Sequence, residues 1–401
     1  MKKSEVFKGL EGRNAPECFA SLRTPCYVID EERLKENGRI LASVAENTGC
    51  RILLAQKAFS NYDFYPALAP YLAGTEASGL YEARLGAEEM PGKEVHVFCA
   101  AYRADEFDEL LKYADHSVFN SVHQLKQFGK TAKEKGKSVG LRINPECSTQ
   151  EGHAIYDPCA PGSRLGVTRD VWNREMTEEL LSLLDGLHFH TLCEQDSDAL
   201  ETTLEATERG FGDVLPRMKW LNMGGGHHIT RADYDRPRLE KLIRRAQDRW
   251  GLQVYLEPGE AVALNAGYLV TTVLDVTENS GIRTAVLDVS AACHMPDVIE
   301  MPYTPPLMNG RTEEPRNHSY RLAGPTCLAG DMIGEYGFDA EVKPGDRLVF
   351  GDMAIYTTCK NNTFNGMPLP DIYRMDREGR FGKLTEFGYA DFKDRLGTKK
   401  A

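Results

Sequence analysis

Residues that can take part in catalysis follow four short apolar runs, each of which reads as a buried strand. Lys57 follows Arg-Ile-Leu-Leu-Ala-Gln, His190 ends Leu-His-Phe-His, and Glu257 ends Val-Tyr-Leu-Glu. Three glycines, Gly224, Gly225 and Gly226, follow the apolar run 218–221. Glycines at such a turn let backbone N–H groups approach an anion that a side chain would keep away. The spacing therefore predicts that an amine, an imidazole, a carboxylate and a phosphate cradle meet in one site.

Each of these groups suits one part of a pyridoxal phosphate site, although each also has a simpler interpretation. Desolvation lowers the pKa of an ammonium group, which would free Lys57 to form a Schiff base with an aldehyde. Alone, such a lysine is usually a surface residue with a buried stem. His190 could stack on a planar ring or be an ordinary core histidine. Glu257 could pair with a protonated pyridine nitrogen or form a salt bridge at a strand end.

Eight apolar runs alternate with segments of helical periodicity, which predicts a (β/α)8 barrel. In that fold the reactive groups stand at the carboxyl ends of the strands, where Lys57, His190, Glu257 and the glycines fall. Helices are expected at 122–134, 174–184, 198–209 and 235–250, and the chain is expected to enter the barrel at 33–46. The expected strands are 51–56, 75–78, 95–100, 117–120, 138–143, 187–192, 219–223 and 252–256.

After Pro258 the pattern changes to strands separated by turns, without helices between them, which predicts a C-terminal β-sandwich or β-barrel domain. Strands are expected at 268–276, 282–289, 321–324 and 347–350. The run 25–29 also reads as a strand and is expected to pair with this later domain. The predicted domains are therefore an N-terminal segment at 1–32, a barrel at 33–265 and a β domain at 266–401.

Composition excludes several classes of function. The chain has 401 residues, 41% of them hydrophobic and 27% charged, with a formal net charge of −12. That charge repels nucleic acid and anionic membranes and favours cationic ligands. No apolar stretch approaches the roughly 20 residues that span a bilayer, and the start lacks an apolar signal core, so we expect a cytoplasmic protein. The ten cysteines show no metal-finger spacing, and His227 and His228 are adjacent on an extended segment, so no metal is predicted.

Six motifs together resemble the alanine-racemase-fold amino-acid decarboxylases, over nearly the whole chain. Within that fold the chain is most similar to the carboxynorspermidine decarboxylase family, on the strings His-Met-Pro-Asp-Val-Ile-Glu-Met-Pro-Tyr (294–303) and Asn-Thr-Phe-Asn-Gly (362–366). The six motifs are Ala-Gln-Lys-Ala-Phe (55–59), Ser-Arg-Leu-Gly (163–166), His-Phe-His-Thr-Leu-Cys-Glu (188–194), Asn-Met-Gly-Gly-Gly (222–226), Glu-Pro-Gly-Glu-Ala (257–261) and Gly-Pro-Thr-Cys-Leu-Ala-Gly-Asp (324–331).

The resemblance implies a pyridoxal 5'-phosphate cofactor and assigns roles in binding it. Lys57 would hold the cofactor covalently, His190 would stack on its face, and Glu257 would pair with the ring nitrogen. Arg164 would contact the ring hydroxyl, and Tyr356 would add a hydrogen bond to the phosphate held by Gly224 to Gly226.

The resemblance also implies a homodimer with shared active sites. Cys327 and Asp331 would enter the active site of a partner subunit, where Cys327 would protonate the carbanion left by decarboxylation. An ordinary buried thiol is the commoner fate of a cysteine.

One departure within the fold bears on the substrate. Ornithine and diaminopimelate decarboxylases have a basic residue after Glu-Pro-Gly, whereas this chain has Glu260. A carboxylate repels phosphate, so Glu260 is expected to face a cation. Carboxynorspermidine and carboxyspermidine carry two ammonium groups beyond the reacting end, and Glu260 and Asp297 are the expected partners. Surface ion pairing is the alternative for both residues.

The resulting hypothesis is decarboxylation of carboxynorspermidine or carboxyspermidine to norspermidine or spermidine, in polyamine biosynthesis. These substrates differ by one methylene, too small a difference to read from residue types. Diaminopimelate decarboxylase is the nearest alternative, but its substrate would want a basic residue for the distal carboxylate. A non-catalytic regulatory homologue would be expected to lack Lys57 or Cys327, and a small cofactor carrier would lack the β domain.

Overall fold

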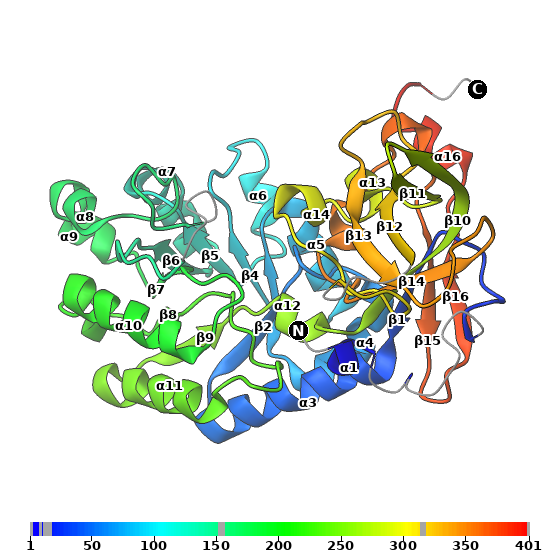
Figure 1. Ribbon diagram of the computed structural model, residues 1–401. Coiled ribbons are helices and arrows are strands. Elements are labelled where there is room, and N and C mark those ends of the chain that lie inside the picture. The colour runs from blue at the N-terminus through cyan, green and yellow to red at the C-terminus, as the bar shows by residue number, and fades with distance from the viewer. Residues whose placement is uncertain (1–2, 8–9, 11–17, 151–156, 313–317, 399–401) are drawn as a thin grey trace. The chain divides into compact units, whose positions relative to one another are not determined.

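The chain forms two compact units in the computed structural model, which describes residues 3–7, 10, 18–150, 157–312 and 318–398 (Figure 1). The barrel unit comprises Lys35–Val262, and the sheet unit joins Met1–Leu34 to Ala263–Ala401. The domain boundaries after residues 32 and 265 stay a prediction. In the described part of the chain, no helix is both long enough and apolar enough to span a lipid bilayer.

Eight parallel strands close the barrel, as the sequence predicted, and the last of them pairs with the first. Buried Leu53, Val118, Trp220 and Tyr255 fill the middle of its interior. The indole of Trp220 needs glycines opposite it, because a Cβ at Gly186 would lie 2.0 Å from the ring. The strands are β2 (Arg51–Ala55), β3 (Gly74–Ala77), β4 (Glu94–Phe98), β5 (His116–Phe119), β6 (Ser138–Arg142), β7 (Gly186–His188), β8 (Trp220–Asn222) and β9 (Gln253–Leu256).

The predicted strand 187–192 is too long at its carboxyl end, because β7 stops at His188. The chain beyond it packs against the glycine turn, where a Cβ at Gly224 would lie 2.4 Å from the carbonyl oxygen of Phe189. His190 therefore stands two residues after the strand, in the segment that contacts this turn.

Helices follow most barrel strands, and side chains or glycines fix their ends. Ser121 accepts a hydrogen bond from the Gln124 amide at the start of α7, and Gly251, with φ of 67°, ends α11. The barrel unit contains α4 (Tyr65–Leu68), α5 (Leu80–Glu89), α6 (Phe107–Leu110), α7 (Val122–Glu134), α8 (Arg169–Glu175), α9 (Glu178–Leu181), α10 (Ser197–Phe211) and α11 (Arg236–Trp250), while α3 (Glu31–Thr48) and α12 (Glu260–Ala263) cross the unit boundaries.

The prediction of one helix at 174–184 was wrong. Two short helices, α8 and α9, cover this part of the chain, and α8 already begins at Arg169. Thr168 and Thr177 each accept a hydrogen bond from a backbone amide three residues later, so each threonine starts a separate helix.

The sheet unit is built on a branched eight-stranded sheet. Its path is β13-β12-β11-β10-β1-β15-β16, and β14 pairs with β10. The N-terminal strand β1 pairs antiparallel with β10 and parallel with β15, which confirms the expected joining of this strand to the later domain. The strands are β1 (Cys26–Asp30), β10 (Gly267–Asn279), β11 (Ile282–Leu287), β12 (His318–Ala323), β13 (Met332–Phe338), β14 (Arg347–Gly351), β15 (Asp371–Met375) and β16 (Phe381–Thr385).

Both faces of the sheet's central strands are buried. Tyr27 and Leu269 belong to one apolar cluster, whereas their neighbours Val28 and Tyr268 belong to another, as the alternation of side chains along a strand requires. Strands β13, β15 and β16 were not predicted from the sequence, and no residue of β16 is fully buried. Short helices complete the unit: α1 (Lys3–Val6), α13 (Ala291–His294), α14 (Asp297–Glu300), α15 (Thr357–Lys360) and α16 (Tyr389–Lys393).

Candidate active site

A layer of buried polar side chains lies at the carboxyl ends of the barrel strands. Arg142, His188 and Asn222 are the last residues of β6, β7 and β8, and Glu257 directly follows β9. All four are buried. Because the strands are parallel and consecutive around the barrel, these positions converge on the face where active sites of this fold lie.

Glu257 is the anion at the centre of this layer. His188 Nε2 lies 3.0 Å from one of its oxygens, and the Asn222 side-chain amide donates a hydrogen bond to the other. Burial alone would raise the pKa of Glu257, but His188, His96 and Lys57 together outweigh burial and hold that pKa below its ordinary range. The carboxylate therefore stays charged at neutral pH and is suited to stabilising a protonated ring nitrogen.

Lys57 stands two residues after β2 and is partly buried. Its ammonium group is close enough to influence the titration of Glu76, Glu257 and His190. The barrel unit thus brings together the predicted amine, carboxylate and imidazole.

Glu76, in β3, is a second buried carboxyl group, which the sequence analysis missed. It is 2% exposed, and its Oε2 atom has no hydrogen-bond partner among the described residues. Burial raises the pKa of Glu76 to about 8, although the charge of Lys57 acts in the opposite direction. The signal was a glutamate inside a predicted buried strand, where a carboxyl group is costly unless it has a use.

His190 and the glycine turn are held against each other. The Gly225 amide donates a hydrogen bond to His190 Nδ1 over 3.1 Å. Burial, followed by the charge of Lys57, lowers the pKa of His190 well below its ordinary value, so the ring is neutral. A neutral, fixed imidazole beside Lys57 agrees with the predicted stacking role, which stays a prediction.

The glycine turn offers fewer unused amides than the sequence analysis assumed. Gly224 and Gly226 have φ angles of 69° and 79°, which favour glycine. The Gly224 amide donates to the Asn222 side chain over 2.9 Å, and the Gly225 amide is engaged by His190. Among the described residues, no acceptor binds the Gly226 amide, so this group is available to an anion while the other two would have to exchange partners.

The predicted contact Arg164 differs from a second arginine that the sequence analysis missed. Arg164 is exposed, and its carbonyl oxygen accepts a hydrogen bond from Asn120. Arg142 is buried, donates to the His190 carbonyl oxygen over 2.9 Å and lies over the Phe98 ring. Burial lowers the pKa of Arg142 to about 10, which Glu257 opposes, so Arg142 remains a cation inside the layer.

Glu260, the first residue of α12, pairs with His228. The distance from His228 Nε2 to Glu260 Oε2 is 3.3 Å, and both side chains are mostly buried. Burial opposes protonation of His228, but Glu260 outweighs it and raises its pKa. The second oxygen of Glu260 has no hydrogen-bond partner in the described part of the chain. Glu260 is therefore a mostly buried carboxylate whose neighbour, His228, can carry a positive charge. The alternative of ion pairing at the surface does not describe Glu260.

Four predicted site residues belong to the sheet unit. The thiol of Cys327 is exposed, and its backbone amide is held by the Asn365 side chain over 2.7 Å. Asp331 is buried and accepts hydrogen bonds from Ser290 and Thr326 over 2.9 and 2.7 Å. Asp331 thus fixes the loop that carries Cys327, and a direct contact with substrate stays only a sequence-based prediction.

The other two residues of the sheet unit are Asp297 and Tyr356. Asp297 and Glu300 share an ion pair with Lys360, so a substrate ammonium group would have to replace that lysine. Tyr356 precedes α15 with a φ of 54°, a conformation that is uncommon for a tyrosine. Its predicted hydrogen bond to a phosphate stays a prediction.

The barrel unit fits the cofactor that the sequence predicted. Pyridoxal phosphate needs an amine for its aldehyde, an anion for its ring nitrogen and amide donors for its phosphate. Lys57, the ionised Glu257 and the Gly226 amide match these needs, and the tight approach of backbone around the glycines leaves no room for a Cβ there.

Comparison with known proteins gives the family. The family model described as pyridoxal-dependent decarboxylase, C-terminal sheet domain, matches residues 26–354. The carboxynorspermidine/carboxyspermidine decarboxylase of Campylobacter jejuni is 41% identical over 93% of this chain and 98% of the relative. The carboxyaminopropylagmatine decarboxylase of Synechocystis is 42% identical over 94% of this chain and 97% of the relative.

Solved structures agree. The crystal structure of carboxynorspermidine decarboxylase from C. jejuni, complexed with norspermidine, matches with a TM-score of 0.84 at 40% identity, over 93% of this chain and all of that one. Diaminopimelate decarboxylases are more distant, since that of Pseudomonas aeruginosa is 26% identical over 85% of each chain. The resemblance read from the sequence is confirmed, and the chain belongs to the pyridoxal-phosphate-dependent decarboxylases.

Proposed function

We propose that this enzyme decarboxylates carboxynorspermidine, carboxyspermidine or both, giving norspermidine or spermidine. The observation that carries the proposal is Glu260, an acidic residue directly after Glu-Pro-Gly, which lies mostly buried in the same unit as Lys57. A relative at 41% identity over nearly the full length bears the name of this activity. A cytoplasmic location and the absence of nucleic-acid partners are parts of the same proposal, favoured by the net charge of −12.

The residues divide the work as follows. Pyridoxal phosphate supplies an electron-accepting ring for the bond that breaks when CO2 leaves. Lys57 holds the cofactor covalently, His190 packs on its face, Arg164 contacts the ring hydroxyl, and Glu257 keeps a proton on its ring nitrogen.

Two residues of the sheet unit complete the proposed roles. Tyr356 adds a hydrogen bond to the phosphate. The Cys327 thiol gives its proton to the carbon that has lost CO2. The exposure of this thiol supports that role, because an exposed thiol can reach a substrate.

Of the two acidic residues proposed to bind substrate, Glu260 is the stronger candidate. Its second oxygen has no partner among the described residues, whereas Lys360 already neutralises Asp297. An ammonium group of the substrate would therefore meet an available carboxylate at Glu260 but would have to displace a lysine at Asp297.

A second candidate substrate is carboxyaminopropylagmatine. The Synechocystis relative with that name is as similar as the C. jejuni relative. A guanidinium group is also a cation that Glu260 could bind, so the acidic residue does not separate these substrates. Diaminopimelate is disfavoured by Glu260, because its distal carboxylate would be repelled.

A substrate panel tests the proposal. The cofactor-loaded enzyme is incubated separately with carboxynorspermidine, carboxyspermidine, carboxyaminopropylagmatine and meso-diaminopimelate, and CO2 release is followed at matched concentrations. We expect turnover of at least one carboxytriamine and none of diaminopimelate. Exclusive turnover of carboxyaminopropylagmatine or of diaminopimelate would overturn the proposal, and silence on all four substrates would favour the regulatory homologue.

The role of Glu260 is tested by Glu260→Gln. This change should raise KM for the preferred carboxytriamine roughly 10- to 100-fold with little change in kcat, because the lost charge contacts a part of the substrate that does not react. Glu205→Gln, an exposed position on α10, is the matched control and should leave KM unchanged. An unchanged KM in Glu260→Gln would remove Glu260 from the substrate site.

The proposed assembly is a homodimer in which Cys327 and Asp331 complete the active site of the partner subunit. Mixing inactive Lys57→Ala with inactive Cys327→Ala chains should then restore about a quarter of wild-type activity, because half of the random dimers contain one intact site of two. Each variant alone is the control. Subunit exchange is verified by mass spectrometry. If the subunits exchange and activity is not restored, Cys327 and Lys57 of the same chain belong to one site.

A further inference from the structure

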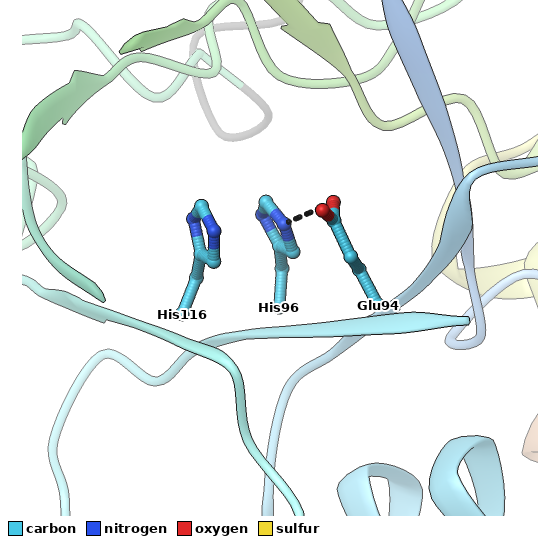
Figure 2. A group of neighbouring side chains, drawn as sticks. All are labelled: Glu94, His96 and His116. Carbon is cyan, nitrogen blue, oxygen red and sulfur yellow. Dashed lines mark hydrogen bonds and ion pairs between the residues drawn. The ribbon is translucent and has the colours of Figure 1, made fainter. Parts of the chain in front are cut away.

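A second cluster of polar side chains lies at the amino ends of the barrel strands, away from the proposed active site. Glu94 and His116 are the first residues of β4 and β5, and His96 is two residues after Glu94. Side chains two apart on a strand share a face. His96 and His116 are direct partners in the pairing of β4 with β5, so all three side chains project together (Figure 2).

The distances in this cluster suit a metal ion. One ligand atom from each of the three residues lies within 4.8 Å of the other two, and this is the one such group of His, Cys, Asp or Glu in the described part of the chain. The distance from His96 Nε2 to Glu94 Oε2 is 3.3 Å. Two ligands bound to zinc at about 2.0–2.1 Å in tetrahedral geometry are separated by about that distance.

The imidazoles have nitrogen atoms without partners. His96 is fully buried, and its Nδ1 atom has no hydrogen-bond partner in the described structure. The same is true of Nδ1 of His116, whose ring stacks on that of His96 with centroids 3.8 Å apart. An imidazole nitrogen without a hydrogen-bond partner is available as a metal ligand.

Surrounding residues hold the three side chains in place. Arg51 Nη2 contacts Glu94 Oε1 at 3.0 Å, which leaves Oε2 facing His96. The Tyr255 ring packs against both imidazoles. Such outer partners orient the ligands of metal sites. The side chains of Arg51 and Glu94 are 44% and 24% exposed, so the carboxylate side of the cluster reaches solvent.

We propose that Glu94, His96 and His116 bind one zinc ion, with water as the fourth ligand. Two imidazoles and one carboxylate form a ligand set that favours zinc over magnesium or calcium, which prefer oxygen ligands. The ion would connect β4 to β5 and thereby stabilise the barrel. None of the three ligands belongs to the proposed active site, so the zinc is not part of the decarboxylation chemistry.

Zinc binding to the cofactor-loaded enzyme tests this proposal. After chelator treatment and dialysis, the enzyme is titrated with ZnCl2 in competition with a chromophoric chelator, and bound zinc is measured by mass spectrometry. We expect one zinc ion per chain, a higher melting temperature with zinc, and more than about 100-fold weaker binding in His116→Asn and Glu94→Gln, which each lose a ligand. His123→Asn, an exposed histidine on α7, is the matched control and should bind like wild type.

Two further readouts keep the test decisive. Cobalt bound in place of zinc should give the intense visible absorption of a tetrahedral centre, and that spectrum should be lost in Glu94→Gln, which nearly preserves the shape of the side chain. The kcat of both ligand variants should equal that of wild type. Binding of equal strength in wild type, Glu94→Gln and His116→Asn, or no stoichiometric binding to wild type, would overturn the site and leave a metal-free stack of neutral imidazoles.

Discussion

The two ends of the barrel interior both carry buried polar groups, yet they differ in the charges present. At the carboxyl end, Lys57 and Arg142 face Glu257 and Glu76, so cations and carboxyl groups influence one another's titration. At the amino end, two imidazoles meet Glu94, which Arg51 holds from the rim. The apolar layer of Leu53, Val118, Trp220 and Tyr255 lies in the barrel core.

These different sets of charges determine what each end can bind. An aldehyde with a phosphate and a basic ring needs a covalent amine, a carboxylate and amide donors, which only the carboxyl end combines. Imidazoles with unused nitrogen atoms beside one carboxylate suit a small cation. Matched substitutions at the two ends can therefore separate catalysis from stability.

The largest difference is expected between two lysines. Lys57→Ala should lower kcat by more than about 1,000-fold and abolish the visible absorption of bound cofactor, because the covalent attachment is lost. Lys93→Ala, at the other end of the barrel, removes a hydrogen bond to the Leu72 carbonyl oxygen and should change kcat by no more than about twofold. Steady-state kinetics and absorption spectra of both purified variants make the comparison. Substantial turnover by Lys57→Ala would disprove its assignment as the cofactor lysine.

A smaller difference is expected between two carboxylates. Glu257→Gln keeps the shape of the side chain but removes the charge proposed to keep the ring nitrogen protonated, so kcat should fall about 100-fold. Glu94→Gln should leave kcat within about twofold. The measurement is kcat at saturating substrate, with cofactor occupancy checked in each variant. If both substitutions lowered kcat equally, the two ends of the barrel would be functionally coupled.

Much of the barrel fold could be predicted from hydrophobic periodicity, and two site residues could be predicted from their positions after strands. The eight barrel strands and their closure could be anticipated because segments of 3.6-residue periodicity separate most of the eight apolar runs. Lys57 and Glu257 were found because the fold places reactive groups at strand ends. Strand β16 was missed because none of its residues is fully buried and it lacks a continuous apolar run.

Other features of the site depend on contacts that no single position reveals. The engagement of the Gly225 amide by His190 joins residues 35 positions apart in the sequence. His228 became relevant only through its pairing with Glu260, 32 positions later. The stacked His96 and His116 required the register of β4 against β5, which the sequence analysis did not attempt.

The smallest effect should have opposite signs at the two ends. Burial raises the pKa of Glu76 from an ordinary 4.5 to about 8, so wild-type stability should fall as the pH rises across that interval. The stability of Glu76→Gln relative to wild type should therefore rise between pH 4.5 and 8. At pH 8.5 the melting temperature of Glu76→Gln should exceed that of wild type by at least about 2 °C.

For Glu94, burial is outweighed by His96 and Arg51, which lower its pKa. The contribution of Glu94 to stability is therefore present at neutral pH and lost as the pH falls below 4.5. Glu94→Gln should therefore melt below wild type at pH 7, with the gap closing in acid. Thermal unfolding of both variants in zinc-free buffer from pH 4 to 9 measures these curves, and a shift of the same sign at pH 8 would mean that the two carboxyl groups do not experience opposite environments.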